Sequence, residues 1–405
     1  MFNFSLKKVN TSPEKVEELL NRGVEEVFVA ENLKKKLLSG RQLRIKFGID
    51  PTGKHIHIGR AVVLRKLKAF QELGHRIVFI VGDFTAQIGD PSDKLEKRPI
   101  LSTKDIRENL TTYRQQVGKI LDLSHTEFRF NGEWLKKLNF QNITELAEMF
   151  SVGQMLERRN FKERYKKGGE ISLREFLYPL IQGYDSFYVR ADVEVGGFDQ
   201  LFNLKAGRVI QKHYGLSEQD ILTTTMLEGT DGRKMSTTWD NVINVTDAPE
   251  DMFGKIMSLH DSLIEKYFLL CTDIPRGEID RITKTLQEHS ENPRDIKMSL
   301  AREIVSLYYG KTRAEKAKKN FIEIFQKKGL PDEIPSVSVS KGASIADALA
   351  EKGVVSSKSE WRRLISEGAI FDMGIGAKIS NQNIVADIEL VLKIGKRKFI
   401  KIIPQ

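Results

Sequence analysis

Apolar and polar positions follow two different periods along the first part of the chain, and these periods predict helices and strands. Residues 14–38 and residues 57–73 carry apolar positions at helical spacing. Residues 43–49 predict a strand, and the β-branched apolar run at 76–81 is typical of a buried parallel strand. The order strand–helix–strand predicts a βαβ unit in a parallel sheet, which binds ligands at the carboxyl ends of its strands.

The chain is predicted to be mainly helical from there to a linker near its C-terminal end. Helices are expected over 104–121, 141–190, 199–214 and almost all of 250–325, with a short strand at 193–195. Pro331 and Pro335 mark the linker, and a small segment of mixed pattern follows at 336–405.

Composition limits the class of protein without deciding it. A chain of 405 residues is too long for one ordinary core, so two or three domains are expected. The net charge of +10 suits a polyanionic partner, but simple solubility would explain it equally well. The single cysteine, Cys271, cannot form an internal disulfide, and neither a secretory signal nor a membrane span is visible. A cytoplasmic protein with no membrane partner is therefore expected.

A phosphate-binding site is expected where the first strand leads into its helix. His57, Gly59 and Arg60 lie at that helix N-terminus, where free N–H groups and the helix dipole attract phosphate. Gly59 would let a nucleotide approach the backbone, and His57 and Arg60, three residues apart, share one helix face. A solvated helix end would carry similar residues, so this pattern is weak alone.

A second basic element occurs at 232–238. It contains Lys234, Met235, Ser236 and Thr237 in a glycine-led loop. Such a loop could close over a pyrophosphate leaving group, although an ordinary exposed loop would look the same. Its combination with the first element, on a parallel-sheet background, favours nucleotide chemistry.

A polar stripe runs along the helix that begins near Ser172. Tyr178, Gln182 and Asp185 are spaced by four and three residues, so they share one face of an otherwise apolar helix. A buried Asp185 would need a hydrogen-bond donor, which a phenol hydroxyl could supply. The alternative is that the stripe faces solvent.

These motifs together resemble those of the class I aminoacyl-tRNA synthetases. Residues 57–60 are similar to their His-Ile-Gly-His signature, and residues 234–238 to their Lys-Met-Ser-Lys-Ser signature. Residues 177–185 resemble the tyrosine-binding helix of the tyrosyl-tRNA synthetases. The resemblance implies a tyrosine–tRNA ligase of bacterial type, which activates L-tyrosine with ATP and transfers it to the 3′ end of its tRNA.

The resemblance also implies a fold class and three domains. The class is α/β, with a Rossmann-like parallel-sheet catalytic domain, an α-helical domain and a small α+β RNA-binding domain. The catalytic domain is expected over 1–228, with a helical connecting insertion at about 105–195. The signature loop and helical anticodon-side domain are expected over 229–330, and the RNA-binding domain over 336–405.

The same resemblance assigns residues to the substrates. Tyrosine contacts fall to Lys46, Thr85, Asp90, Tyr178, Gln182, Asp185 and Gln200. ATP contacts fall to Gly48, Asp50, Thr52, His57, Gly59, Gly197, Asp199, Lys234, Met235, Ser236 and Thr237. The catalytic set is His57, Arg60, Lys94, Arg98 and Lys234. ATP is expected to enter with Mg²⁺, and no structural metal is expected.

Several positions depart from the family pattern. Thr237 replaces the second signature lysine, and Arg60 replaces the second signature histidine. Arg60 is longer and permanently charged, so its contact to phosphate would differ in geometry. Lys46 stands where many bacterial members carry a tyrosine, and Phe198 stands at a usual Ser/Thr position.

Residues 356–368 resemble the helix of a small RNA-binding fold shared with a ribosomal protein. Ser357 and Glu360 have capping-box spacing, and Gly368 suits a helix stop. Lys358, Arg362 and Arg363 would then present a basic face to tRNA phosphates, although a solvated basic helix would look the same. The resemblance further implies a homodimer, with its interface between about 105 and 195.

Three other functions remain open from the sequence. A tryptophanyl-tRNA synthetase shares both signatures, but Asp185 with Tyr178 favours tyrosine. A catalytically impaired RNA-binding paralogue would fit Thr237 and Arg60, but it would not need an amino-acid pocket. A nucleotidyltransferase of related fold would not need the segment 336–405.

Overall fold

The computed structural model describes residues 8–92, 101–236, 239–326, 334–395 and 398–405. The chain forms two compact units. The first unit comprises Met1–Asp247 and Leu259–Leu300, and the second comprises Ala248–Ser258 and Ala301–Gln405. The division thus runs through the helical domain expected at 229–330.

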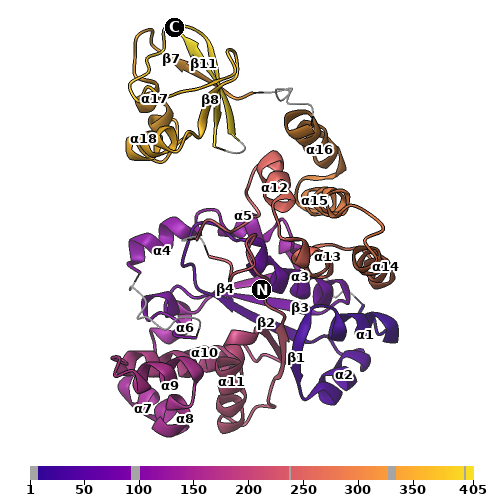
Figure 1. Cartoon of the computed structure of the whole chain (residues 1–405). Helices are drawn as coiled ribbons and strands as arrows, with labels where there is room; N and C mark the ends of the chain where they lie inside the picture. Colours follow the sequence, from indigo (N-terminus) through magenta and orange to yellow (C-terminus); the bar gives the residue numbers. More distant parts are fainter. Residues whose placement is uncertain (1–7, 93–100, 237–238, 327–333, 396–397) are drawn as a thin grey trace. The chain divides into compact units, whose positions relative to one another are not determined.

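A six-stranded sheet forms the centre of the first unit (Figure 1). In spatial order its strands are β1 (Val24–Phe28), β6 (Asp220–Thr224), β5 (Val193–Gly197), β2 (Arg44–Ile49), β3 (Arg76–Val81) and β4 (Thr126–Phe130). β1 is antiparallel to β6, and the other neighbours are parallel. The parallel pairing of β2 with β3 confirms the predicted βαβ unit.

The prediction of one helical segment over 14–38 was wrong. The structure has α1 (Pro13–Asn21), β1 and α2 (Ala30–Leu38) there. Gly23 adopts a positive φ of 62°, which ends the first helix, and the short run 24–28 then pairs along β6. The strands β4 and β6 were also not predicted, because each has only five residues.

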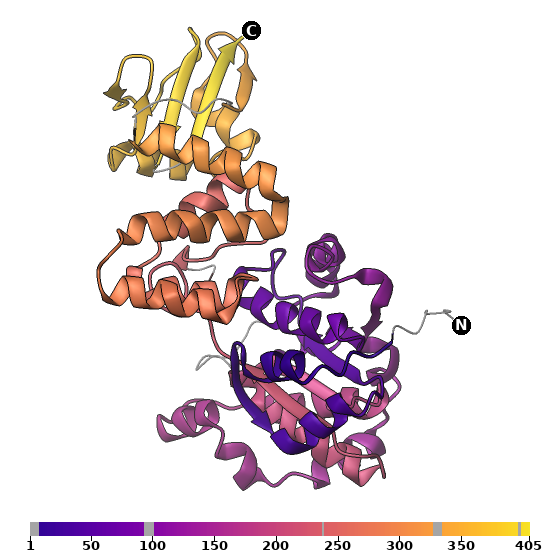
Figure 2. The ribbon, with the colours of Figure 1, turned by 90° about the vertical axis from the view of Figure 1, so that its right-hand side faces the viewer.

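Helices cover both faces of this sheet (Figure 2). Besides α1 and α2, the helices of this unit are α3 (Ile58–Glu72), α4 (Thr103–Leu110), α5 (Tyr113–Val117), α6 (Gly132–Leu135), α7 (Phe140–Glu148), α8 (Val152–Leu156), α9 (Arg159–Lys166), α10 (Leu173–Tyr188), α11 (Leu201–His213), α13 (Ile264–Cys271) and α14 (Arg276–Gln287). Among the described residues, no helix is long and apolar enough to cross a bilayer.

The strand order reverses between β2 and β5. The connection from β2 through α3 leads to β3 on one side, and the connection from β5 through α11 leads to β6 on the other. Because such crossovers are right-handed, the two helices lie on opposite faces of the sheet (Figure 1). The register between β2 and β5 comprises two residue pairs, Ile45–Val193 and Lys46–Glu194. Beyond these pairs the carboxyl ends diverge, which is the place where open α/β sheets bind ligands.

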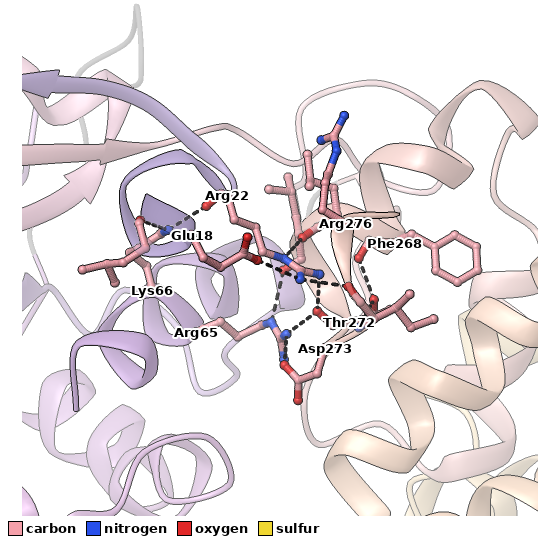
Figure 3. A network of polar contacts seen from close by, with 12 residues as sticks. Glu18, Arg22, Arg65, Lys66, Phe268, Thr272, Asp273 and Arg276 are labelled. Atoms are coloured by element: carbon pink, nitrogen blue, oxygen red, sulfur yellow. Dashed lines mark hydrogen bonds and ion pairs between the residues drawn. The ribbon is translucent and has the colours of Figure 1, made fainter. Parts of the chain in front are cut away.

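Two arginines hold the C-terminal end of α13 against the first part of the chain (Figure 3). Arg22, just after α1, donates to three carbonyl oxygens within residues 269–274 at 2.8–3.0 Å. Arg65 of α3 donates to the carbonyl oxygen of Thr272 and to the carboxylate of Asp273, both at 2.6 Å. The last carbonyls of a helix lack partners within it, so these guanidinium groups satisfy acceptors that would otherwise be unpaired.

The second unit contains a five-stranded sheet and its own core. The strands, in spatial order, are β7 (Ser336–Val339), β11 (Lys398–Pro404), β10 (Leu390–Ile394), β8 (Ile370–Asp372) and β9 (Ala377–Lys378). Its helices include α12 (Pro249–Met257), α16 (Lys311–Gln326), α17 (Ile345–Glu351) and α18 (Lys358–Ser366), while α15 (Pro293–Tyr309) spans the division between the units. Trp361 is fully buried in the core of the C-terminal sheet. This part confirms the expected α+β fold.

We expect Arg22→Met to lower the free energy of unfolding by about 1–3 kcal/mol, because it leaves several partly buried carbonyls without their donor. Urea denaturation would measure the change. Arg276→Met is the matched control, since Arg276 is exposed and pairs with Asp280 one helical turn away. Its effect should stay within about 0.5 kcal/mol. Equal losses in the two variants would contradict the role assigned to Arg22.

Candidate functional site

A cavity of about 410 Å³ opens where β2 and β5 diverge. Its walls include residues 47–50 at the end of β2 and residues 195–197 at the end of β5. The start of α3 and one face of α10 complete it. The cavity therefore occupies the topological switch point of the sheet.

Most of the predicted site residues line this cavity. They are Gly48, Asp50, Thr52, His57, Gly59, Arg60, Thr85, Asp90, Tyr178, Gln182, Asp185, Gly197, Asp199, Gln200, Lys234, Met235 and Ser236. Lys94, Arg98 and Thr237 lie outside the described residues. Lys46 is described, but it does not belong to the cavity wall.

Asp185 is a buried carboxylate at this cavity, with 3% of its surface exposed. Its two oxygens accept hydrogen bonds from Trp134 Nε1 at 2.7 Å and from Asn131 Nδ2 at 3.2 Å. Burial raises the pKa of Asp185 to about 7, and the Lys46 cation and these two donors oppose the rise. The fold therefore supplies two donors to Asp185 itself. Each carboxylate oxygen retains further acceptor capacity.

A second polar group surrounds Asp90. Gln200 Nε2 donates to Asp90 Oδ2 at 2.6 Å, and Asn203 Nδ2 donates to Gln182 Oε1 at 3.0 Å. Asn203 Nδ2 also lies 3.1 Å from Gln200 Oε1. One carboxylate and two amide oxygens are thus fixed at one part of the cavity, an acceptor set that suits a primary ammonium group.

Arg158 supports this acceptor group from outside the cavity wall. Its guanidinium donates to Ser92 Oγ at 2.9 Å and to Asn203 Oδ1 at 3.0 Å. It also lies over the rings of Phe161 and Phe202. Burial lowers the pKa of Arg158 to about 10, and the nearby Asp90 opposes that change, so the side chain stays cationic at neutral pH.

Asp50 joins three parts of the site. Its carboxylate accepts from Tyr178 Oη at 2.8 Å and from Thr85 Oγ1 at 2.6 Å. A side chain at Gly82 would come within 2.0 Å of Asp50 Oδ1, so only glycine fits beside it. Asp50 therefore fixes the end of β2 against α10.

The N-terminus of α3 presents two different groups. His57 Nδ1 accepts from the Arg60 amide at 3.3 Å, so the ring proton is on Nε2. Burial, with the charges of Arg60 and Lys234, lowers the pKa of His57 to about 3, so the ring is neutral. Arg60 donates to Thr52 Oγ1 at 2.8 Å and to Tyr113 Oη at 3.2 Å. The site thus combines one neutral donor and one fixed cation.

Gly59 and Met235 bring the two sequence signatures together. A Cβ at position 59 would lie 3.2 Å from the sulfur of Met235 and 3.1 Å from the ring of His57. The start of α3 also pairs with residues that follow the loop, through Ile58 N to Ile243 O at 2.8 Å. The resemblance predicted that these segments act together, and the fold places them in contact.

Five residues that help to form the site were not predicted from the sequence. They are Asn131, Trp134, Arg158, Glu194 and Asn203, all buried. Asn131 and Trp134 follow β4, so recognising that strand would have placed them at the carboxyl edge of the sheet. The other three carry no local signal, because most of their partners in the site are distant in sequence.

The predicted RNA-binding residues lie on α18 in the second unit. Lys358, Arg362 and Arg363 are all exposed there. Lys358 pairs with Asp347 at 2.5 Å, and Arg363 pairs with Glu367 at 2.8 Å. Ser357 caps the helix by accepting from the Glu360 amide at 3.2 Å, as predicted, but Glu360 contacts Ser356 and not the cap residue itself.

Comparison with known proteins assigns the chain to a family. A model of the class I tRNA synthetases (W and Y) matches residues 38–326. The chain is 47% identical over 392 residues to the tyrosine–tRNA ligase of Thermotoga maritima, covering 96% of this chain and 98% of that protein. It is 45% identical to the tyrosine–tRNA ligase of Carboxydothermus hydrogenoformans, covering 95% and 97%.

Solved structures agree on the fold. A truncated mitochondrial tyrosyl-tRNA synthetase from Aspergillus nidulans superposes with a TM-score of 0.64 at 23% identity, over 77% of this chain and 94% of that one. The tyrosyl-tRNA synthetase of Archaeoglobus fulgidus superposes with a TM-score of 0.60 at 21% identity, over 75% of this chain and 99% of that one.

The chain belongs to the class I tRNA synthetases. Within that class it falls among the tyrosine–tRNA ligases, as the sequence motifs indicated.

The buried carboxylate predicts how stability depends on pH. Because the pKa of Asp185 is about 7 in the folded chain and 3.8 as an ordinary aspartate, the folded state binds this proton more tightly. The resulting stabilisation is complete below about pH 4 and is lost as the pH rises through about 7. Relative to Asp185→Asn, the free energy of unfolding of the wild type should fall by up to about 4 kcal/mol across this window. Urea denaturation of both chains between pH 4 and 8 tests this, and a constant difference would contradict it.

Proposed function

We propose that the chain charges tRNA with tyrosine in two steps. Tyrosine and ATP first form tyrosyl-adenylate and release pyrophosphate, and the tyrosyl group then passes to the 3′ end of the tRNA. The observation that carries the choice of amino acid is the buried Asp185 carboxylate at the cavity between β2 and β5. Family membership supports the ligase activity.

The two polar groups of the cavity fit the two ends of tyrosine. The phenol hydroxyl would donate to Asp185, whose oxygens accept from Trp134 and Asn131 and can accept one bond more. The ammonium group would bind the acceptors around Asp90, Gln182 and Gln200. Phenylalanine would leave desolvated acceptors beside an apolar ring edge, which disfavours it.

The start of α3 would bind the phosphates of ATP. The helix N-terminus supplies N–H groups, Gly59 leaves room for the nucleotide, and neutral His57 and cationic Arg60 face the cavity. Lys234 would stabilise pyrophosphate as it leaves. Asp199 would bind the ribose, and Lys94 and Arg98 would close over the phosphates.

Magnesium would enter as part of the ATP complex. Within the described ranges, no three His, Cys, Asp or Glu side chains are grouped to hold a metal ion. The ion would neutralise phosphate charge, while Lys234 and Arg60 add fixed positive charge from the protein.

We propose that the enzyme is active despite Thr237. The amino-acid part of the cavity keeps its carboxylates and amides, and Arg60 adds a permanent cation that the usual signature histidine does not supply. A non-catalytic RNA-binding paralogue would not need such a cavity. A tryptophanyl enzyme is disfavoured because Asp185 together with Tyr178 favours tyrosine, and because the relatives named above are tyrosine–tRNA ligases.

A homodimer is proposed for the region around α7–α10. Large apolar side chains are exposed on these elements and beside them, among them Phe130, Phe140, Val152, Tyr165, Leu173 and Tyr188. Phe140 and Leu173 are 83% and 79% exposed, which is unusual for isolated surface residues. A second copy of the chain would cover them, in agreement with the interface expected at about 105–195.

The second unit would bind tRNA through α18, in the cytoplasm where tRNA is charged. Lys358, Arg362 and Arg363 are exposed on one short helix, so they can reach phosphates without unfolding the domain. Trp361 and Ile365 anchor the opposite helix face in the core.

Exchange of labelled pyrophosphate into ATP tests the proposed activity. Exchange should depend on tyrosine and should be far weaker with tryptophan or phenylalanine. Phenylalanine has no donor for Asp185, and the indole N–H of tryptophan lies at a different place on a larger ring system. Asp185→Asn should lose most of the preference for tyrosine over phenylalanine. A wild-type chain that shows no exchange at any tyrosine concentration would refute the proposal.

Removing the α18 charges should weaken tRNA binding without affecting activation. The variant Lys358→Ala/Arg362→Ala/Arg363→Ala should raise the KM for tRNA, and the salt dependence of log K should decrease by up to about 3 because fewer counterions are released. Pyrophosphate exchange should stay at the wild-type rate. An equal loss in exchange and charging would contradict a tRNA-specific role.

A further inference from the structure

Lys46 and Glu194 face each other at the fork of the sheet. They form the second of the two residue pairs that join β2 to β5, just before the strands diverge. Both side chains are buried, with 0% and 1% of their surface exposed. The Lys46 ammonium lies 2.8 Å from Glu194 Oε1. An ion pair therefore closes the sheet directly behind the cavity.

The remaining donors of Lys46 bind α10. The ammonium donates to the carbonyl oxygen of Gln182 at 2.9 Å and to Ser186 Oγ at 2.7 Å. These two residues lie one turn apart and bracket Asp185 on the same helix. All three ammonium hydrogens are thus used, and two of them fix the turn that carries both Gln182 and Asp185.

Glu194 extends the contact to the cavity itself. It lines the cavity wall, and its Oε1 accepts from Gln182 Nε2 at 3.3 Å. With the amide nitrogen directed to Glu194, Gln182 Oε1 turns to Asn203 and the acceptor group around Asp90. Glu194 Oε2 accepts from Ser186 Oγ at 2.9 Å and from Gln219 Nε2. Each carboxylate oxygen of Glu194 therefore has a fixed donor.

We propose that Lys46 and Glu194 are a positioning pair for the tyrosine site: they hold one turn of α10 at the fork between β2 and β5, so that Gln182 presents its oxygen to the ammonium group and Asp185 its carboxylate to the phenol. Neither residue was assigned this role from the sequence, where Lys46 was expected to contact tyrosine directly. The proposal rests on the function proposed above.

The charges around the fork explain why the pair is sensitive to loss of one member. Asp185 and Glu194 are two buried carboxylates at one cavity. The Lys46 cation pairs directly with Glu194 and acts on Asp185 through its charge. Without Lys46, Glu194 would be a buried anion near another buried anion. Removing one partner of a buried pair costs far more than replacing both by neutral groups. The loss of Lys46 should therefore displace α10, and neutralising Glu194 as well should relieve much of that displacement.

The test compares steady-state constants in pyrophosphate exchange. Lys46→Met should raise the KM for tyrosine by at least about tenfold. The KM for ATP should stay within about twofold, because the hydrogen bonds of Lys46 reach α10 and β5 and not the start of α3. The double variant Lys46→Met/Glu194→Gln should recover most of the loss, since no buried charge then lacks a partner. Ser186→Ala, which keeps every charge and removes the bridging hydroxyl, should give a smaller rise in the KM for tyrosine only.

A matched control separates positioning from general stability. Arg164 and Glu175 form another buried ion pair at the first turn of α10, with 7% and 6% of their side chains exposed and a distance of 2.5 Å. Neither residue lines the cavity. Arg164→Met should lower stability while leaving the KM for tyrosine near the wild-type value.

Several results would overturn the proposal. One is a KM for tyrosine in Lys46→Met that is unchanged, or that rises equally with the KM for ATP. Another is a double variant whose KM for tyrosine is as high as that of the single variant. A third is the same rise in the KM for tyrosine in Arg164→Met. If Lys46→Met does not fold, the KM values for tyrosine and ATP are measured in the double variant and in Ser186→Ala instead. A rise in Ser186→Ala that is absent, or equal for both substrates, then overturns the proposal. Absence of exchange in the wild type would refute the tyrosine–tRNA ligase function itself, which is a separate outcome.

Discussion

The burial of the Asp185 carboxylate is the interaction on which the rest of the site depends. A carboxylate removed from water is expensive unless donors surround it, and here Trp134 and Asn131 provide two. The remaining cost appears as a pKa raised to about 7. Such a group stays buried only where several neighbouring residues fix its surroundings. Here those residues come from β2, β5, α6 and α10. The carboxylate gives the cavity a specific acceptor at the expense of stability.

The sheet topology creates the space in which this group can act. Reversal of strand order between β2 and β5 parts their carboxyl ends, and α3 and α10 approach the opening from opposite faces of the sheet. The result is one cavity with a neutral donor and a cation at the start of α3, and with two carboxylate-centred groups near α10. The groups proposed to bind phosphate and amino acid are thereby adjacent, and Asp50 connects them through its hydrogen bonds from Tyr178 and Thr85. The Lys46–Glu194 pair lies at the point where the strands part and links the sheet to α10.

Local sequence patterns predicted the helices and strands whose own residues show a clear period. Residues 43–49, 57–73 and 76–81 have clear periods, and they became β2, α3 and β3. The stripe of Tyr178, Gln182 and Asp185 correctly marked one helix face, because helical spacing alone determines it. The short strands β1, β4 and β6 were not predicted, since pairing with distant strands stabilises them more than their own sequence does.

The partners of the site residues were the main omission. Tyr178 was assigned to tyrosine, and nothing in the sequence indicated that its hydroxyl donates to Asp50, 128 positions away. Lys46 was expected at the substrate and instead pairs with Glu194 across the fork. Spacing cannot reveal such contacts, because strand register and helix packing determine them. Most of the residues that the family resemblance assigned line one cavity, while their individual contacts came only from the fold.

The most direct test of this account is a crystal structure of the protein with L-tyrosine bound. We predict that the phenolic oxygen lies within hydrogen-bonding distance of a carboxylate oxygen of Asp185, with the ammonium group among Asp90, Gln182 and Gln200. A structure in which the ring lies elsewhere, or in which the ammonium group and not the phenol contacts Asp185, would contradict it.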